Sequence, residues 1–249
     1  GFAIGRDTDV QGTILKTTDG GDSWSVVWQD TDRRSLNAIK FIGTSTGYVV
    51  GENGLTLKTT DGGDTWYPFP IGEYNDLYDL YMTGTEEVYA VGEMGAIFKT
   101  TNGGQDWTGL VSNTLAQLNT VTFVNSSVGF AAGTMGIVVK TEDGGDSWTF
   151  VSPEDATATF NSMVFTSATT GYVAGTFGAL YKTEDAGATW TMLDPMTTYS
   201  LYAMTFPTPS TGYIVGDAGL LLKTTDAGAT WESKIAENES YVDQNRLHQ

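Results

Sequence analysis

The sequence predicts an all-β fold, a single six-bladed β-propeller whose blades are four-stranded antiparallel sheets. The first observation is a repeat. The stretch Lys-Thr-Thr-Asp-Gly-Gly-Asp-Ser-Trp at 16–24 returns in five close copies, and the tryptophans that end the six copies lie 41 or 42 residues apart. A fixed period near 40 residues with strand-like content favours a propeller over a helical solenoid. The second observation is composition, since 31 glycines against 6 prolines suit many short strands joined by tight turns.

One full period contains four short apolar segments separated by turn residues, the pattern of an antiparallel meander. The segments from Leu36 predict strands at 36–42, 48–51 and 55–59 and a fourth that begins near Trp66. The same four segments recur from Leu77, Leu118, Phe160 and Leu201. Five blades are therefore expected to be complete.

The first period differs, because it begins at Gly-Phe-Ala-Ile-Gly, which aligns with the second strand of the other periods. It also carries an insertion at 6–12. We therefore expect a propeller over 1–235 whose first blade lacks its inner strand, followed by a polar tail at 236–249. Because an open ring leaves sheet edges unpaired, the vacant strand must be supplied by the tail, by residues outside this sequence, or by a partner.

The repeated motif Thr/Ser-x-Asp-x-Gly-x-x-Trp has a structural explanation. Its carboxylate accepts hydrogen bonds from backbone N–H groups of the turn, its glycine supplies the positive φ, and its tryptophan packs on the blade. Asparagine replaces aspartate in one copy, as this kind of turn tolerates. Six equivalent copies around a ring cannot converge on one catalytic or metal site, so these residues are predicted to be structural: Asp19, Trp24, Asp61, Trp66, Asn102, Trp107, Asp143, Trp148, Asp185, Trp190, Asp226 and Trp231.

The charge balance argues against two classes of partner. The formal net charge is −18 with 12 basic residues, and six of the eight lysines belong to the repeated motif. Such a surface repels phosphate backbones and anionic lipid headgroups, so neither nucleic-acid binding nor membrane insertion is expected. The absence of cysteine excludes disulfides and thiolate metal sites.

The repeated motif resembles the Asp box of bacterial neuraminidase repeats. The combination Gly-Tyr-x-x-Gly-x-x-Gly followed by Lys-Thr-Thr-Asp-Gly-Gly-x-x-Trp is similar to the propeller family that includes the photosystem II assembly and stability factor. This resemblance covers 1–235 and implies a non-enzymatic, extracytoplasmic protein (secreted, periplasmic or at the cell surface) that binds other proteins during assembly. The arginine patch attributed to photosynthetic members is not matched here, since the chain has only Arg6, Arg33, Arg34 and Arg246.

Any individual site is predicted on one face of the disc, which we call the variable face. It comprises the turns between second and third strands and the connections from each fourth strand to the next blade at 29–35, 72–76, 112–117, 152–159 and 194–200. These connections differ between repeats, and positions that vary on a repeated scaffold commonly carry function. Met94, Met135 and Phe177 occupy one equivalent turn position, where they could form an apolar ring at the channel mouth or plug the channel as core. Tyr74 and Tyr199 could contact protein or glycan, or pack on their blades.

Charged residues on the same face have two interpretations each. Arg33 and Arg34 could bind a ligand or pair with the neighbouring Asp30 and Asp32. Together with Asp7 and Asp9, those two aspartates could also bind Ca²⁺, although the spacing is not that of a twelve-residue calcium loop. No other cofactor is expected.

The function predicted from these residues is protein binding by a non-catalytic assembly factor or adhesion scaffold. A structural subunit that polymerises by strand donation between copies of this chain is the alternative. A carbohydrate-binding module is a weaker possibility. A sialidase-like hydrolase is disfavoured because four arginines, two of them adjacent and one in the tail, cannot form the required three-arginine cluster. Two-propeller hydrolases need a second propeller, and one histidine without cysteine excludes triad chemistry.

Overall fold

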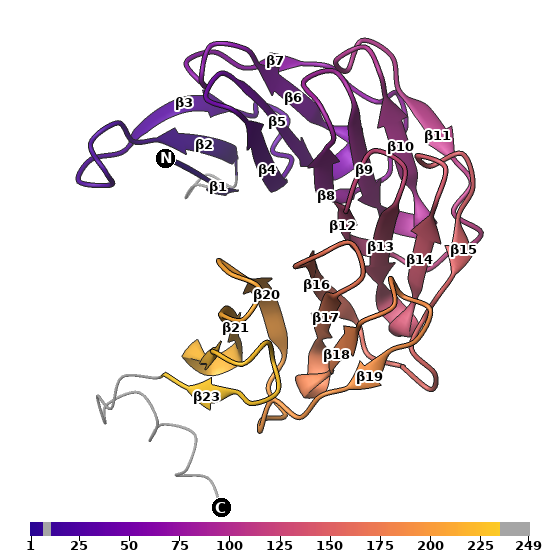
Figure 1. Ribbon diagram of the computed structural model, residues 1–249. Coiled ribbons are helices and arrows are strands. Elements are labelled where there is room, and N and C mark those ends of the chain that lie inside the picture. Colours follow the sequence, from indigo (N-terminus) through magenta and orange to yellow (C-terminus); the bar gives the residue numbers. More distant parts are fainter. Residues whose placement is uncertain (7–10, 235–249) are drawn as a thin grey trace, which may run out of the picture.

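The computed structural model describes residues 1–6 and 11–234 and confirms an all-β propeller of six blades (Figure 1). The first blade has three strands and the other five have four, each in meander order. Blade 1 comprises β1 (Phe2–Arg6), β2 (Gly12–Lys16) and β3 (Ser25–Gln29), and blade 2 comprises β4 (Leu36–Ile42), β5 (Thr46–Gly51), β6 (Thr56–Thr59) and β7 (Tyr67–Pro68). β5 begins two residues before the predicted start, because its first residues pair with the end of β4 across the turn.

The remaining blades repeat this plan. Blade 3 comprises β8 (Leu77–Met82), β9 (Val88–Gly92), β10 (Ile97–Thr100) and β11 (Thr108–Leu110), and blade 4 comprises β12 (Leu118–Phe123), β13 (Gly129–Gly133), β14 (Val138–Thr141) and β15 (Thr149–Phe150). Blade 5 comprises β16 (Phe160–Phe165), β17 (Gly171–Gly175), β18 (Leu180–Thr183) and β19 (Thr191–Met192), and blade 6 comprises β20 (Leu201–Thr205), β21 (Gly212–Gly216), β22 (Leu221–Thr224) and β23 (Glu232–Ser233). None of the described residues forms a helix long and apolar enough to cross a membrane.

The six blades follow one another around an arc, with the first strand of each complete blade innermost and the fourth at the rim (Figure 1). Blade 1 and blade 6 flank an opening in this arc. β1 is the inner edge strand of its sheet, so blade 1 has three strands within the described residues. The predicted contribution of the tail at 236–249 lies outside the described residues.

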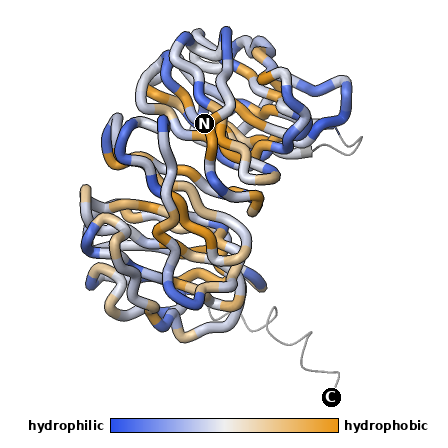
Figure 2. Tube along the Cα trace, turned by 90° about the vertical axis from the view of Figure 1, so that its right-hand side faces the viewer, coloured by the Kyte–Doolittle hydropathy of each residue, from blue (hydrophilic) through white to orange (hydrophobic). Residues whose placement is uncertain are grey.

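The core lies between successive blades. Hydrophobic segments run through the stacked sheets, and hydrophilic segments gather in the loops (Figure 2). An aromatic residue in the second strand of one blade packs on the end of the first strand of the next, as in Tyr89 on Phe123 with ring centroids 4.2 Å apart and Tyr172 on Phe206 at 4.4 Å. Tyr89, Phe123 and Tyr172 are buried and Phe206 is partly buried, and the packing of these rings joins neighbouring blades.

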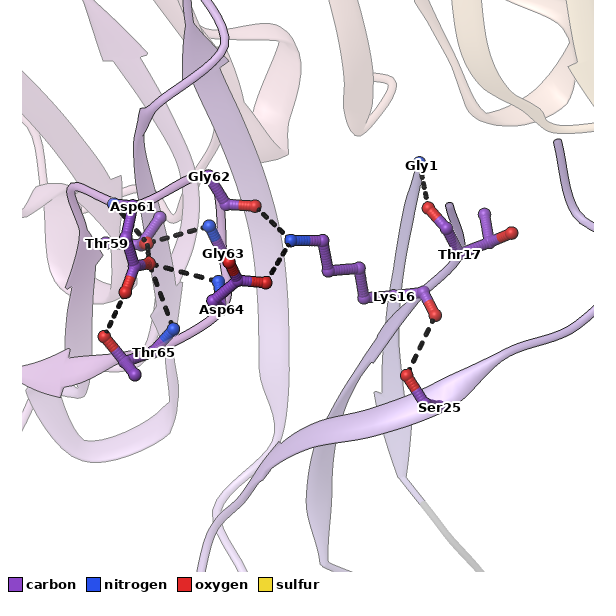
Figure 3. A network of polar contacts seen from close by, with 10 residues as sticks. All are labelled: Gly1, Lys16, Thr17, Ser25, Thr59, Asp61, Gly62, Gly63, Asp64 and Thr65. Carbon is purple, nitrogen blue, oxygen red and sulfur yellow. Dashed lines mark hydrogen bonds and ion pairs between the residues drawn. The ribbon is translucent and has the colours of Figure 1, made fainter. Parts of the chain in front are cut away.

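The repeated lysines reinforce the same contact. In every blade the lysine Nζ lies over the aromatic ring at 5.1 to 5.9 Å, a cation–π distance. In blades 1 to 3 it also donates a hydrogen bond to a carbonyl of the following blade's motif turn, as from Lys16 to Gly62 at 2.7 Å (Figure 3). Lys16 adds an ion pair of 2.6 Å with Asp64. We call the aromatic residue, the lysine and the facing turn the interblade contact.

The motif turns are held as predicted. In blade 2 the Thr59 hydroxyl donates to Asp61 at 2.8 Å, and Asp61 accepts hydrogen bonds from the N–H of Thr65 at 3.0 Å and its hydroxyl at 2.6 Å (Figure 3). Thr59 in turn accepts the N–H of Gly63 at 2.9 Å. The bonds from the threonine hydroxyl, to that hydroxyl and from the later backbone N–H recur in all six copies, and Asn102 substitutes its amide oxygen for the carboxylate. The hydroxyl of the later Ser or Thr donates to the aspartate in five copies, whereas Asn102 Nδ2 instead donates to Asp106 at 2.9 Å. Each aspartate is therefore engaged within its own turn.

A glycine at the end of each second strand allows close approach of two backbones. Gly133 ends β13 in extended conformation, where a Cβ would overlap the carbonyl oxygen of Gln117. That carbonyl precedes the first strand of the same blade and accepts the N–H of Thr134 at 2.9 Å. Glycine is needed here because the backbone, not a flexible side chain, occupies the space.

Replacing Gly133 with alanine should therefore destabilise the protein by about 2–3 kcal/mol, the usual cost of overpacking. Urea unfolding followed by circular dichroism measures the change. Gly84→Ala is the matched control, because a Cβ there meets nothing within 4 Å. An equal loss of stability in both variants would show that the close approach at Gly133 is not limiting.

Acid should weaken the motif turns. Hydrogen bonds from a hydroxyl and backbone N–H groups lower the pKa of Asp143, Asp185 and Asp226 to about 2, below the ordinary 3.8. A lowered folded-state pKa contributes stability that is present above pH 4 and lost as pH falls toward 2. The free energy of unfolding should decline across that window. Asp143→Asn, which imitates Asn102, should make the decline shallower.

Denaturant titrations at several pH values between 2 and 6 test this expectation. Asp22→Asn is the control, since it removes the same charge without touching a motif hydrogen bond. If Asp143→Asn and Asp22→Asn change the pH dependence equally, the decline reflects general charge and not the motif turns.

Candidate functional site

The turns between second and third strands and the connections to the next blade share one face, as expected for the variable face. In blade 2 the N–H of Gly54 donates to the carbonyl of Asn75 at 2.9 Å, and in blade 4 the N–H of Gly136 donates to Ala158 at 2.7 Å. These bonds join each turn to the connection leaving the same blade. The variable face is therefore built from adjacent pairs of loops.

Each of these turns holds a non-glycine residue in the left-handed region. The turns are η1 (Glu52–Gly54), η2 (Glu93–Gly95), η3 (Thr134–Gly136), η4 (Thr176–Gly178) and η5 (Asp217–Gly219), and the central residue has a φ between 54° and 59° in all five. The central residues are Asn53, Met94, Met135, Phe177 and Ala218. Left-handed backbone is uncommon for bulky side chains and is relieved by glycine, so an apolar residue here carries a conformational cost.

The three bulky residues at this position extend into solvent. Phe177 is 83% exposed, Met94 66% and Met135 64%, so they do not plug the channel as core. A central cavity of about 560 Å³ is instead lined by first strands, including Asn37, Asp79 and Asn119. Burial raises the pKa of Asp79, with Lys40 3.8 Å away as its counter-charge.

A second cavity, of about 570 Å³, lies on the variable face of blades 2 and 3. Met94 projects into its lining together with Ile71, Val111 and Leu115, and Glu73 is the only charged residue that lines it. Val111 and Leu115 are exposed, and the sequence analysis did not single them out. The sequence feature that could have identified them is the presence of two large apolar side chains in a short, mostly polar connection. Tyr74, also exposed, follows Glu73 directly.

Blade 5 presents a smaller apolar group. Phe177 lies in a turn whose Gly178 is in close contact with the backbone of the connection at Thr197. That connection carries Met196 and Tyr199, both exposed, and Met196 also has a positive φ of 58°. Tyr199 thus lies beside the turn of Phe177, whereas Tyr74 lies near Met94. Met94 with Tyr74, and Phe177 with Tyr199, thus form two groups on the variable face, and Met135 lies in the turn of the intervening blade 4.

The arginine pair separates into two different environments. Arg34 pairs with buried Asp30, its Nη2 and Nε lying 2.8 and 3.2 Å from the two carboxylate oxygens, and its N–H donates to Asp30 at 2.7 Å. Burial alone would raise the pKa of Asp30, but these bonds and the charge of Arg34 hold it below its usual value. Arg34 also lies 3.3 Å from Asp32. Arg33 is exposed with a φ of 64° and forms no hydrogen bond or ion pair with the described residues.

The predicted calcium site is only partly described. Asp7 and Asp9 lie outside the described residues, and Asp30 and Asp32 both contact Arg34. Within residues 1–6 and 11–234 no cluster of three or more histidine, aspartate or glutamate side chains could hold a metal ion.

Comparison with solved structures identifies proteins that share the fold. YCF48 bound to D1 peptide matches with a TM-score of 0.76 and 23% identity over 94% of this chain and 78% of that chain. YCF48 from Cyanidioschyzon merolae matches with a TM-score of 0.70 and 20% identity over 93% and 83%. A GH74 xyloglucanase from Xanthomonas campestris matches with a TM-score of 0.74 and 16% identity, but this chain covers only 44% of the enzyme. None of the curated proteins compared with the chain matches it.

Comparison with protein families gives a match over most of the sequence. The family described as photosynthesis system II assembly factor YCF48 matches residues 1–122 and 114–198. The match spans the repeats on which the sequence resemblance rested, and the strand order and motif turns agree with it. The chain therefore belongs to the YCF48 family of photosystem II assembly factors.

Proposed function

We propose that this chain is a non-catalytic, extracytoplasmic propeller that binds a segment of another protein through the variable face, acting as an assembly factor or scaffold. The observation that carries the proposal is the exposure of Met94, Met135 and Phe177 from left-handed turns. Glycine would relieve the backbone at each position, so the side chains are retained at a conformational cost that a contact with a partner explains. Membership of an assembly-factor family, and the D1 peptide bound to a relative, support protein as the ligand class.

The partner segment is expected to be apolar with neutral or positive charge. The cavity beside Met94 is lined by apolar side chains, by uncharged polar ones such as Asn75 and Thr114, and by Glu73, with no lysine, arginine or histidine. The protein carries a formal charge of −18, which would repel an acidic peptide and attract a basic one. Exposed methionines adapt to partners of different shape, which suits an assembly factor.

The motif residues support a non-catalytic role. The five motif aspartates each accept hydrogen bonds inside their own turns, where donors hold their carboxylates ionised. Arg34 forms ion pairs with Asp30 and Asp32. A hydrolase would need an unengaged acid and base directed into one cleft.

Binding of a D1 peptide, measured by isothermal titration calorimetry, tests the proposal. Replacing both Met94 and Phe177 with serine should weaken binding by about tenfold or more, since each loses an apolar contact of 1 kcal/mol or above. Phe150→Ser is the control, because Phe150 is an exposed aromatic residue on the outer strand β15. Failure of the unmodified protein to bind, or an equal loss in the control, would contradict the proposal.

A second candidate function is a structural subunit that polymerises by strand donation. No strand within residues 1–6 and 11–234 pairs with the inner edge of β1, and this favours the candidate because an exposed edge is a template for another strand. If the candidate is correct, light scattering after size exclusion should give a mass that is a multiple of 26.7 kDa and grows with concentration. A constant mass of 26.7 kDa across concentrations would exclude it.

A further inference from the structure

The outer strand of blade 3 has a glycine at a position where the other four complete blades carry a side chain. In β11, Gly109 pairs with Phe98 of β10. The residues at the same place in the register of β7, β15, β19 and β23 are Pro68, Phe150, Met192 and Ser233. In blade 3 alone among these five, the third strand therefore has no side chain opposite it on the outer strand.

Among the described residues, neither backbone conformation nor packing requires glycine at 109. Gly109 does not have a positive φ, and a Cβ there would lie 3.6 Å from the ring of Phe98, an ordinary van der Waals contact. Gly133, by contrast, has no room for a Cβ beside the carbonyl of Gln117. Glycine weakens a strand relative to alanine, and it often marks a place where a ligand approaches the strand closely.

The space beside Gly109 is the cavity on the variable face of blades 2 and 3. Phe98, which is buried, and Trp107, which is partly buried, supply two aromatic rings to its lining. Met94 and Leu115 also line it and are exposed, so they lie at its mouth. The volume of about 570 Å³ is within the range of small-ligand sites, roughly 300–1,000 Å³. The cavity can therefore accept a large ring between aromatic walls and a flexible mouth.

The mouth of the cavity is acidic. Glu73 lines the cavity and is exposed, and its carboxylate forms no hydrogen bond or ion pair with the described residues. Two more acidic residues, Asp76 and Glu93, directly adjoin the lining residues Asn75 and Met94 in the sequence. No lysine, arginine or histidine lines the cavity. An unpaired carboxylate beside an aromatic hollow is complementary to a cation that adjoins an aromatic ring.

We propose that this cavity, which we call the Gly109 pocket, anchors an aromatic side chain of a partner peptide in which a lysine or arginine stands next to that side chain. The inference rests on the proposed function, because it names the peptide chemistry that one part of the variable face selects. The aromatic ring lies opposite Phe98, as Phe150 lies opposite Val139 in blade 4. The neighbouring cation pairs with Glu73.

NMR of the full chain, with ¹³C-labelled methyl groups on its seven methionines, tests the proposal. The probe is the capped peptide Gly-Ser-Phe-Lys-Ser-Gly, and two matched probes have serine in place of phenylalanine or glutamate in place of lysine. The first probe should shift the Met94 methyl signal and leave that of Met192, on the outer strand of blade 5, unchanged. Loss of the phenylalanine should weaken binding about tenfold or more, and loss of the lysine about threefold or more.

Three variants test the pocket itself. Gly109→Phe should weaken binding of the first probe at least about tenfold, because the new ring fills the space that the probe needs. Ser233→Phe is the matched control, since it adds the same side chain at the equivalent position of blade 6 and should leave binding unchanged. Glu73→Gln should keep the requirement for phenylalanine and remove most of the preference for lysine. This variant tests the proposal even if Gly109→Phe does not fold.

Other results would overturn the proposal. An equal Met94 shift in the unmodified protein and in Gly109→Phe would show that the probe does not enter the pocket. A Met94 shift on dilution without any probe would assign the pocket to a second copy of this chain. If no probe shifts Met94 but the D1 peptide binds in calorimetry, the pocket is excluded and the proposed function stands. If neither the probes nor the D1 peptide bind, both proposals fail.

Discussion

The fit between an aromatic ring on one blade and a glycine turn on the next is the constraint on which the rest of the structure depends. The turn can approach the ring because glycine lacks a Cβ, and in blades 1 to 3 the lysine above the ring then reaches a carbonyl of the same turn. Because ring, lysine and turn come from one repeat, a single sequence unit specifies both of its neighbours. Any change in the spacing between them would misplace all three groups at once, which explains the near-constant period of 41 or 42 residues.

The variable face takes no part in the interblade contact. The aromatic–lysine–turn contacts that join blades use the strands and the motif turns, whereas the central side chains of η2 and η4 extend into solvent. Side chains such as Met94 and Phe177 can therefore differ from those of η1 and η5 without loosening a junction. The scaffold is repetitive and the surface is individual, which is the arrangement that a binding module requires.

The sequence predicted those features that arise from local pattern. The blade count follows from spacing and is confirmed. The missing strand of blade 1, the structural role of the motif aspartates and the tolerance of Asn102 follow in the same way from spacing and hydrogen-bonding capacity, and the structure describes three strands in blade 1 and hydrogen bonds to Asn102 within its turn. Features that depend on assembly in three dimensions could not be predicted in this way. The opening beside Trp24 depends on how far each blade rotates about the axis, and the repeat alone does not encode that angle in a readable form.

The same limit on prediction from local sequence pattern applies to the candidate functional site. The sequence identified Met94 but not Val111 and Leu115, because their convergence requires the turn of blade 3 to meet the connection that leaves the same blade. It also left open whether Arg34 binds a ligand or pairs with its neighbours, and only the folded structure shows that Arg34 pairs with a buried Asp30. The left-handed turns went unnoticed because a methionine or phenylalanine before glycine carries no propensity for that conformation.

The position of the lysines at the junctions determines how few amino groups the surface of the molecule exposes. The junction lysines that form ion pairs have side chains only 12% to 20% exposed, whereas Lys40 and Lys234 are about half exposed. Six of the eight lysines thus face the aromatic ring of their own blade. A neighbour approaching through water therefore meets few free amines, in a protein whose 30 acidic residues outnumber its 12 basic ones.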